Sequence, residues 1–245
     1  MNENELLKKR INELCNRAYS KYYNTFTDFL NVDEISILNG LRLSGEYKLF
    51  GGYDLADRCV AGFGDGVEEK DFPICCIEIK PARQKFADKL THRDFLGALM
   101  NLGINRSTLG DIVINENTGY LFCLNTIAGY IVDNLDKIKH TTVGCSIIEQ
   151  VPDFMHKEPE ATELIVSSLR IDAVVSSVYK LSRSQSSRLF IQEKVFVNSK
   201  AVTKESHTLK NGDIVSVRGY GKFIFSQPLR ETKKGKTVVE ILIYR

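Results

Sequence analysis

The sequence predicts an α+β protein made of several small domains, and three patterns support this fold class. Apolar residues recur at spacings of three and four near the N-terminus, strand and helix patterns alternate over residues 72–152, and both patterns return in a basic last third. We expect a mainly helical region over 1–71, a central domain over 72–152, a linker over 153–167 and a C-terminal α/β domain over 168–245. A chain of 245 residues is long enough to give each domain its own core.

Composition is typical of a soluble globular protein, with 43% hydrophobic and 26% charged residues. No apolar run approaches the roughly 18 residues that span a bilayer, and the start, MNENELLKKRINEL, lacks the apolar segment of a signal peptide. We therefore expect a cytoplasmic protein with no membrane, small-molecule, metal or cofactor partner.

Charge is distributed unevenly along the chain, although the formal net charge is only +2. Residues 168–245 contain 15 Lys and Arg against 6 Asp and Glu, a charge of +9, whereas residues 1–167 contain 18 against 25, a charge of −7. A basic end on an acidic body predicts binding of a polyanion. The alternative is a basic tail that only aids solubility, but here the charges interleave with apolar positions and glycine turns.

The cysteines have neither the paired CxxC spacing of a zinc site nor the density of a disulfide scaffold. We expect them to be reduced and mostly buried. A nucleophile at Cys75 or Cys76 is the catalytic alternative, but adjacent residues of a strand point to opposite faces. The six cysteines are Cys15, Cys59, Cys75, Cys76, Cys123 and Cys145.

Two helices are predicted in the first region. The first carries an apolar stripe formed by Leu7, Ile11, Leu14, Cys15, Ala18 and Tyr22. The second covers VDEISILNGLRL, where Asp33 is placed to cap the helix and Gly40 to end it. The following FGGYDLADRCVAGFGDG is rich in glycine but lacks the spacing of a phosphate-binding loop, so we expect a structural loop.

The central segment has the element order β-α-β-β-α-β. The strand PICCIEIK precedes the helix THRDFLGALMNLG, in which Thr91 and Asp94 form a capping pair and Gly103 ends the helix. A hairpin of GDIVI and GYLFCLN follows, then a helix capped by Asn125 and a last strand, TTVGCSIIEQV. This order predicts a ferredoxin-like sandwich, a four-stranded sheet with two helices on one face.

The open face of such a sheet has two possible uses. Tyr120 and Phe122 alternate on one strand and could stack RNA bases, as aromatic residues do in RNA-recognition motifs, or they could fill the core or a domain interface. Basic residues also give this domain a candidate second RNA-binding set. They are Arg83, Lys85, His92, Arg93 and Arg106.

The C-terminal domain begins with a short amphipathic helix that ends near Lys180. Ser182 is a natural N-cap for the next helix, because its hydroxyl can accept from the amides of the first turn. The positive end of that helix then lies beside Arg183, Ser184 and Arg188. Amide donors, hydroxyls and guanidinium groups at one point favour binding of phosphate.

Short strands follow this helix. In KVFVNSKAV the alternation predicts that Val195 and Val197 point inward and Phe196 outward, before a turn at Asn198. LKNGDIVSVRG then adds a glycine turn and a strand that carries Arg218. We predict phosphate contacts and hydrogen bonds from exposed polar residues and base stacking from Phe196. The predicted RNA-binding residues are Arg170, Lys180, Ser182, Arg183, Ser184, Arg188, Lys194, Phe196, Asn198, Lys200, Arg218 and Lys222.

This segment, Leu169 to Arg218, resembles the S-four-type RNA-binding domain, named for a ribosomal small-subunit protein. Four ordered elements carry the resemblance: RID at Arg170, SRS at Ser182, VFVN at Val195 and NGD at Asn211. The chain departs from the pattern at Glu193, where the family usually has glycine, and at Asn198-Ser199, which replaces asparagine-glycine. A left-handed backbone at Glu193 would cost about 1 kcal/mol.

The wider chain is similar to the YlmH-like proteins, which place this domain behind an RNA-binding domain. The resembling stretches are KFADKLTHRDFLGALMNLGI, LGDI and RETKKGKTVVEI. The resemblance implies a bacterial cytosolic protein that binds ribosomal RNA or tRNA on the ribosome, at the large subunit, in rescue of stalled translation. A role near cell division is also attached to the family.

Two other functions compete with non-catalytic RNA binding. Related RNA-binding domains are attached to pseudouridine synthases and methyltransferases, but they usually precede a large catalytic region, and only 27 residues follow Arg218 here. A protein-interaction adaptor could instead use the basic domain to meet an acidic partner. Non-catalytic binding of structured RNA is the function that the sequence favours.

Overall fold

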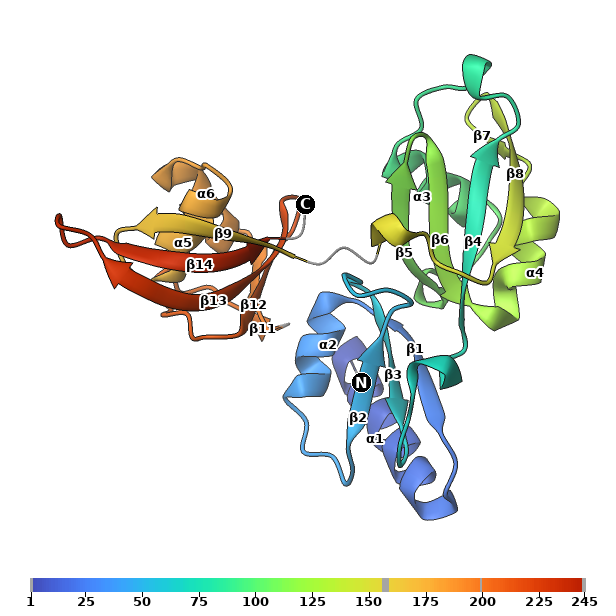
Figure 1. Cartoon of the computed structure of the whole chain (residues 1–245). Helices are drawn as coiled ribbons and strands as arrows, with labels where there is room; N and C mark the ends of the chain where they lie inside the picture. Colours follow the sequence, from blue (N-terminus) through green and yellow to red (C-terminus); the bar gives the residue numbers. More distant parts are fainter. Residues whose placement is uncertain (1, 156–158, 199, 244–245) are drawn as a thin grey trace. The chain divides into compact units, whose positions relative to one another are not determined.

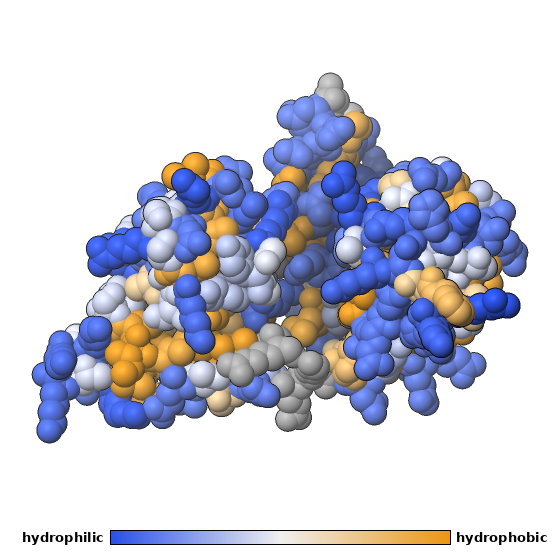
Figure 2. Space-filling model, turned by 90° about the horizontal axis from the view of Figure 1, so that it is seen from above, coloured by the Kyte–Doolittle hydropathy of each residue, from blue (hydrophilic) through white to orange (hydrophobic). Residues whose placement is uncertain are grey.

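The structure is a computed structural model that describes residues 2–155, 159–198 and 200–243. The chain divides into two compact units, Met1–His156 and Lys157–Arg245, and both combine helices with antiparallel sheets (Figure 1). The α+β class is therefore confirmed. Most of the surface visible in Figure 2 is hydrophilic, and hydrophobic residues reach it in scattered patches. Within the described residues, no helix has the length and apolar character needed to cross a membrane.

The first part of unit 1 is a three-stranded sheet with two helices. The strand order is β1-β3-β2, and both pairings are antiparallel. The expectation of a mainly helical region was wrong. The glycine-rich stretch, expected to be a loop, contains the central strand β3, and β2 ends where this stretch begins. Their bounds are α1 (Glu3–Lys21), β1 (Thr25–Leu30), α2 (Val32–Asn39), β2 (Tyr47–Phe50) and β3 (Cys59–Phe63).

The two helices differ from the predictions at their ends. Tyr22 does not continue the apolar stripe of α1, because it is 88% exposed and ends the helix with a φ of 55°. The N-cap of α2 is Asn31 and not Asp33, since Asn31 Oδ1 accepts from the Glu34 amide while Glu34 Oε2 accepts from the Asn31 amide. Gly40 ends α2 as predicted.

The central part of unit 1 has the predicted order β-α-β-β-α-β, with one short additional strand. Its antiparallel sheet runs β5-β6-β4-β8-β7. Helices α3 and α4 pack on one face, where Phe95 and Ile131 meet Ile77 and Leu121 (Figure 1). The bounds are β4 (Ile74–Pro81), α3 (His92–Asn101), β5 (Leu109–Asn115), β6 (Thr118–Leu124), α4 (Asn125–Asn134), β7 (Lys137–Ile138) and β8 (Thr141–Ile148).

The sequence predicted the ends of α3 more accurately than the start of α4. The capping box of Thr91 and Asp94 is present, and Gly103 follows the helix with a φ of 75°. Asn125 is the first residue of α4, so its N-cap is Leu124. The helix ends at Asn134, and β7 begins at Lys137.

The other face of the central sheet is covered by the first part of the unit. Tyr120 and Phe122 are 8% and 1% exposed and pack in one cluster with Phe29 and Val60. Tyr53 also stacks on Phe122, with ring centroids 4.9 Å apart. The two aromatic residues of β6 therefore fill a domain interface, and base stacking on this face was the wrong alternative.

Polar contacts join the two parts of unit 1 around Arg58 and Asp111. Arg58 Nε donates to the Leu109 carbonyl at 2.8 Å, and its Nη2 donates to the Phe29 carbonyl at 3.0 Å. Asp111 Oδ2 accepts from the Asp57 amide at 2.6 Å and from Tyr53 Oη at 3.1 Å. The glycine-rich stretch therefore supplies side chains and amides that attach it to β5.

Unit 2 is a six-stranded antiparallel sheet with two helices packed on one face. The strand order is β11-β10-β12-β13-β14-β9. Val174 of α5 and Phe190 of α6 pack against Val215 and Phe223 of the sheet. The bounds are β9 (Glu160–Val166), α5 (Ile171–Val178), α6 (Arg183–Ile191), β10 (Val195–Val197), β11 (Lys200–Ala201), β12 (Asp213–Val217), β13 (Gly221–Glu231) and β14 (Thr237–Ile243).

The predicted linker contains a strand. Residues 153–155 form a 3-10 turn, residues 156–158 lie outside the described residues, and Glu160–Val166 forms β9 at the edge of the sheet. β9 pairs with β14 at the edge of the sheet, and all its side chains except Val166 are exposed or half-buried, so its apolar run is limited to residues 164–166. Its polar composition therefore resembled a linker.

Candidate nucleic-acid interface

The start of α6 has the predicted capped geometry. Ser182 Oγ accepts from the Gln185 amide at 3.3 Å, and Gln185 Oε1 accepts from the Ser182 amide at 2.9 Å, which completes a capping box. Leu189 and Phe190 are buried and hold the helix on the sheet. Ser182, Arg183 and Ser184 are exposed, so the positive end of the helix faces solvent beside a guanidinium group.

A polar groove of about 560 Å³ lies beside this helix start. Arg170 and Arg183 both line it, so the structure brings these two predicted residues together. Arg170 Nε and Nη2 donate to the two carboxylate oxygens of Asp172 at 3.0 and 2.8 Å. Lys236 also lines the groove and was missed, although the basic stretch TKKGK marks its position. The other hydroxyl-bearing or acidic residues of the groove are Ser167, Ser168, Ser176, Ser177, Ser186, Ser187 and Glu205.

Phe196 does not point outward into solvent, as the alternation predicted. It is 1% exposed, and the guanidinium carbon of Arg218 lies 4.9 Å from the centroid of its ring. Val195 and Val197 face the helices as predicted. Base stacking on Phe196 was therefore a wrong prediction, because an arginine already lies against the ring and the residue is buried.

Asn198 has a role within the sheet. Its Nδ2 donates to Asp213 Oδ1 at 2.9 Å, and its Oδ1 accepts from the Ile214 amide at 3.0 Å. Its φ of 49° places it in the left-handed region, and Glu193 also adopts the left-handed backbone expected where the family has glycine, with a φ of 51°. These residues shape the connections on either side of β10; Ser199 lies outside the described residues.

The remaining predicted cations are distributed over two faces of unit 2. Lys180, with a φ of 53° between α5 and α6, and Arg188 of α6 are exposed on the helical side. Lys222 lies opposite Ser216 on the neighbouring strand, and Ser216 lies opposite Phe196. Because side chains of residues paired across strands point to the same face, Lys222 points to the sheet face opposite the helices. Lys200 is exposed at the edge strand, and Lys194 is half-buried.

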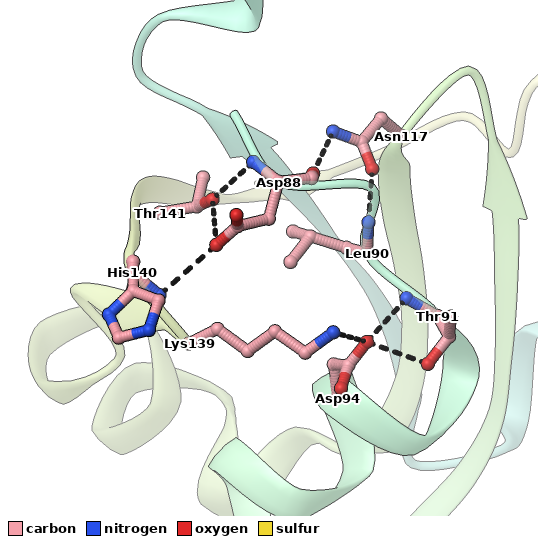
Figure 3. Close-up of polar contacts among 8 residues, drawn as sticks. All are labelled: Asp88, Leu90, Thr91, Asp94, Asn117, Lys139, His140 and Thr141. Carbon is pink, nitrogen blue, oxygen red and sulfur yellow. Dashed lines mark hydrogen bonds and ion pairs between the residues drawn. The ribbon is translucent and has the colours of Figure 1, made fainter. Parts of the chain in front are cut away.

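A second group of exposed cations gathers at one end of the central part of unit 1. Four members of the candidate second RNA-binding set lie on or beside the segment from β4 to the start of α3. They are Arg83, Lys85, His92 and Arg93. The turn between β7 and β8 reaches the same end, because the His140 amide donates to Asp88 Oδ2 (Figure 3). Exposed cationic or ionisable residues that the sequence reading missed are Lys89, Lys137, Lys139 and His140.

Arg106 does not belong to this group. Its Nη1 donates to the carbonyls of Leu109 and Gly110 at 2.6 and 3.2 Å. Burial and the neighbouring charge of Arg58 lower the pKa of Arg106 to about 10. Arg106 is half-buried, and its guanidinium group holds the backbone of unit 1, so the structure does not place it with the exposed basic residues of this end.

Hydrogen bonds attach the β4–α3 segment to the sheet (Figure 3). The Asp88 amide donates to Thr141 Oγ1 at 2.9 Å. Asn117 Nδ2 donates to the Asp88 carbonyl at 2.9 Å, and Asn117 Oδ1 accepts from the Leu90 amide at 2.7 Å. These contacts give a long connection a defined conformation and so fix the positions of its basic side chains.

Lys139 reaches the start of α3 from the β7–β8 turn. Its Nζ lies 2.8 Å from Asp94 Oδ2, which also accepts from the Thr91 amide at 2.8 Å and from Thr91 Oγ1 at 2.6 Å (Figure 3). Lys139 and the Thr91 donors lower the pKa of Asp94 to about 2. The ion pair neutralises one acidic side chain at this basic end.

We expect the Asp94 carboxyl to titrate with a midpoint near pH 2 in the folded protein. Because its folded pKa is depressed, the stability that this group contributes is present above its unfolded pKa, about 3.9, and is lost as the pH falls toward 2. Titration of the carboxyl carbon by NMR measures the midpoint. In the Lys139→Met variant the midpoint should rise; an unchanged midpoint would show that Thr91 alone causes the shift.

All six cysteines are free in the structure. Cys75 pairs with Cys123 and Cys76 with Phe122, so the two adjacent side chains point to opposite faces, as predicted. Burial raises the pKa of Cys76 to about 12, the reverse of what a reactive thiolate needs. Across the described residues, no three His, Cys, Asp or Glu side chains gather in a way that could hold a metal ion.

Comparison with known proteins gives a family for this chain. Residues 67–151 match the family model described as "Putative RNA-binding domain in YlmH". The chain is 33% identical over 228 residues to the ribosome-associated protein quality control protein P2 of Bacillus subtilis, covering 88% of this chain and 86% of that protein. This chain belongs to the YlmH-like family. The resemblance to YlmH-like proteins seen in the sequence is confirmed.

The matched model places the YlmH RNA-binding domain on the central part of unit 1, from before β4 to beyond β8. A solved structure, the cell division protein ylmH from Streptococcus pneumoniae, is also similar, with 23% sequence identity and a TM-score of 0.46. The match covers 60% of this chain and 92% of the chain in the solved structure. The exposed cations Arg83, Lys85 and Lys139 and the exposed His140 all lie within the residues that match the RNA-binding model.

Proposed function

We propose that this chain is a non-catalytic protein that binds structured RNA on the ribosome in the bacterial cytoplasm. Unit 2 serves as an S-four-type RNA-binding domain, and the central part of unit 1 is a ferredoxin-like domain that binds RNA as well. The membership of the YlmH-like family supports this function. Phosphate contacts dominate such binding, so recognition depends mainly on the shape of the RNA.

The observation that carries the proposal is the capped start of α6. Ser182, Arg183 and Ser184 are exposed there, and Arg183 enters a polar groove that Arg170 and Lys236 also line. Backbone amides at a helix start and guanidinium groups bind phosphate oxygens well. Arg188 follows Ser184 by one turn of the same helix and extends the cationic surface.

The ribosomal partner is proposed from the relative whose printed name describes a ribosome-associated quality control protein. We propose the large subunit with a bound tRNA as the target and rescue of stalled translation as the process. The charge of +9 in residues 168–245 suits a surface made largely of RNA phosphates.

The test is sedimentation of cell extract through sucrose gradients at low and high salt. Wild-type protein should travel with the large subunit at low salt and be released at high salt. For the Arg183→Ala, Arg188→Ala double variant, we expect an affinity for large subunits at 0.1 M salt about 25- to 60-fold lower, because each lost phosphate contact costs roughly five- to eightfold. The salt slope should fall by about 0.7 to 0.9 per contact.

A matched control removes the same charge elsewhere. Arg10 and Arg17 are exposed on α1, so the Arg10→Ala, Arg17→Ala double variant should sediment like wild type. If the α6 double variant binds with unchanged affinity and salt slope, the assigned site is wrong. If wild-type protein stays at the top of the gradient at every salt concentration, the ribosomal function is wrong.

A further inference from the structure

The central part of unit 1 has a pocket of about 400 Å³ beside an exposed aromatic ring. We call it the Phe86 pocket; the residues that line it are Ala82, Arg83, Phe86, Ala87, His140, Thr141 and Thr142. Phe86 is 78% exposed. A phenylalanine so exposed leaves most of its ring in water, which a stacked ligand would relieve.

The segment that carries Phe86 is held in place around the ring. Gln84–Phe86 forms a 3-10 turn, and Gln84 Nε2 donates to the Glu116 carbonyl at 3.3 Å. On the other side, the Ala82 amide donates to the Thr142 carbonyl at 2.9 Å. With the Asp88 and Asn117 hydrogen bonds, these contacts hold the backbone on both sides while the Phe86 ring stays in solvent. Such an arrangement resembles a preorganised binding surface.

Charge around the Phe86 pocket favours an anionic ligand. Arg83 lines the pocket itself, and Lys85 and Lys89 lie within three residues of Phe86 and are exposed. His140 lines the pocket as well. Two carboxylates at this end are already engaged, since Asp88 accepts from the His140 amide and Asp94 pairs with Lys139. An exposed ring beside cations is the combination that single-stranded nucleic acids require.

We propose that the Phe86 pocket binds one unpaired RNA nucleotide, whose base stacks on Phe86 and whose phosphate contacts Arg83. His140 closes the other side of the base. The inference rests on the proposed function that the chain binds RNA, and it names the surface of the central part that does so. The sheet face cannot stack a base, because Tyr120 and Phe122 are buried against the first part of the unit. The pocket volume lies within the range of ligand sites.

The test uses full-length protein and a short single-stranded RNA that carries one 2-aminopurine, a base whose fluorescence falls when it stacks on a ring. We expect quenching with wild type and with Phe86→Trp. Phe86→Ala should abolish the quenching and weaken binding on the order of tenfold, within the range found for loss of one base–aromatic stack. Phe86→Leu keeps an apolar side chain but no ring, and it should behave like Phe86→Ala.

Matched variants separate this site from the proposed C-terminal site. Tyr22 is 88% exposed in the first part of unit 1, and Tyr22→Ala should leave quenching unchanged. The Arg183→Ala, Arg188→Ala protein should keep the Phe86-dependent quenching, even though it is expected to leave the ribosome. Because Phe86 is exposed, its variants should show the circular dichroism and melting temperature of wild type.

Two results would overturn the inference while leaving the proposed function intact: quenching that survives Phe86→Ala, and binding of duplex RNA but of no single strand. If the protein binds no RNA and also stays at the top of the sucrose gradients, both proposals fail. If wild-type protein captures a partner protein that Phe86→Ala does not capture, and quenches no oligonucleotide, the pocket is a protein-docking site and the inference is also overturned.

Discussion

Replacing Asp111 with alanine is expected to lower the free energy of unfolding of unit 1 by about 3 kcal/mol. The change leaves the half-buried Tyr53 hydroxyl without its acceptor, which costs about 1–3 kcal/mol where water cannot replace it, and it removes the acceptor of the more exposed Asp57 amide. It also removes the carboxylate that offsets the positive charges of Arg58 and Arg106. Hydrogen exchange of peptides from β3 and β5, followed by mass spectrometry, measures the loss where it occurs.

Two variants control this prediction. Asp111→Asn keeps an acceptor of the same shape and should cost less, about 1 kcal/mol. Asp133 is exposed on α4, so Asp133→Ala should change stability by no more than about 0.5 kcal/mol. A cost for Asp111→Ala as small as that for Asp133→Ala would show that the Asp111 contacts do not hold the two parts of unit 1 together.

Replacing Gly119 with alanine is expected to destabilise unit 1 by about 2–3 kcal/mol, the usual range for an overpacked core. A Cβ at position 119 would lie 2.4 Å from Cε1 of Phe95, inside van der Waals contact. Phe95 is fully buried between α3 and the sheet, so the ring has no space into which it can move. Urea unfolding followed by circular dichroism measures the change.

The same substitution at Gly97 should change the free energy of unfolding in the opposite direction. Gly97 lies within α3, and a Cβ there would meet no atom within 4 Å. Alanine in an open helical position should stabilise the protein by about 0.5–1 kcal/mol. Gly119→Ala combined with Phe95→Leu should recover part of the loss if the ring is the obstacle. Equal effects at positions 97 and 119 would contradict the packing explanation.

Signals that act within a few residues were predictable from the sequence. The capping pair of Thr91 and Asp94, the N-cap at Ser182 and the order of elements in the central part all depend on neighbours along the chain. The strands β2 and β9 were not predictable in this way. Apart from the buried Val166, their side chains are half-buried or exposed, so what stabilises them is largely pairing with other strands.

Burial of the candidate site residues depended on tertiary packing. Phe196 is covered although its alternation indicated an outward side chain, and Arg106, a member of the candidate second RNA-binding set, donates to backbone carbonyls. Lys139 reaches Asp94 across 45 residues, a contact that no local pattern predicts. Charge type can be read from a sequence, but whether a charged group faces water depends on which distant segment packs against it.

The sequence by itself determined the α+β class, the basic C-terminal end, the capped start of α6 and the resemblance to the YlmH-like family. Only the tertiary structure decided that the β6 aromatic residues are covered, that Arg170 and Arg183 share a groove, and that Phe86 stands exposed beside Arg83 and His140. The physical reason is the distance along the chain over which the interactions act. Helix caps and periodicity arise from hydrogen bonds a few residues apart, whereas a binding surface is formed by whatever the packing of distant segments leaves in contact with water.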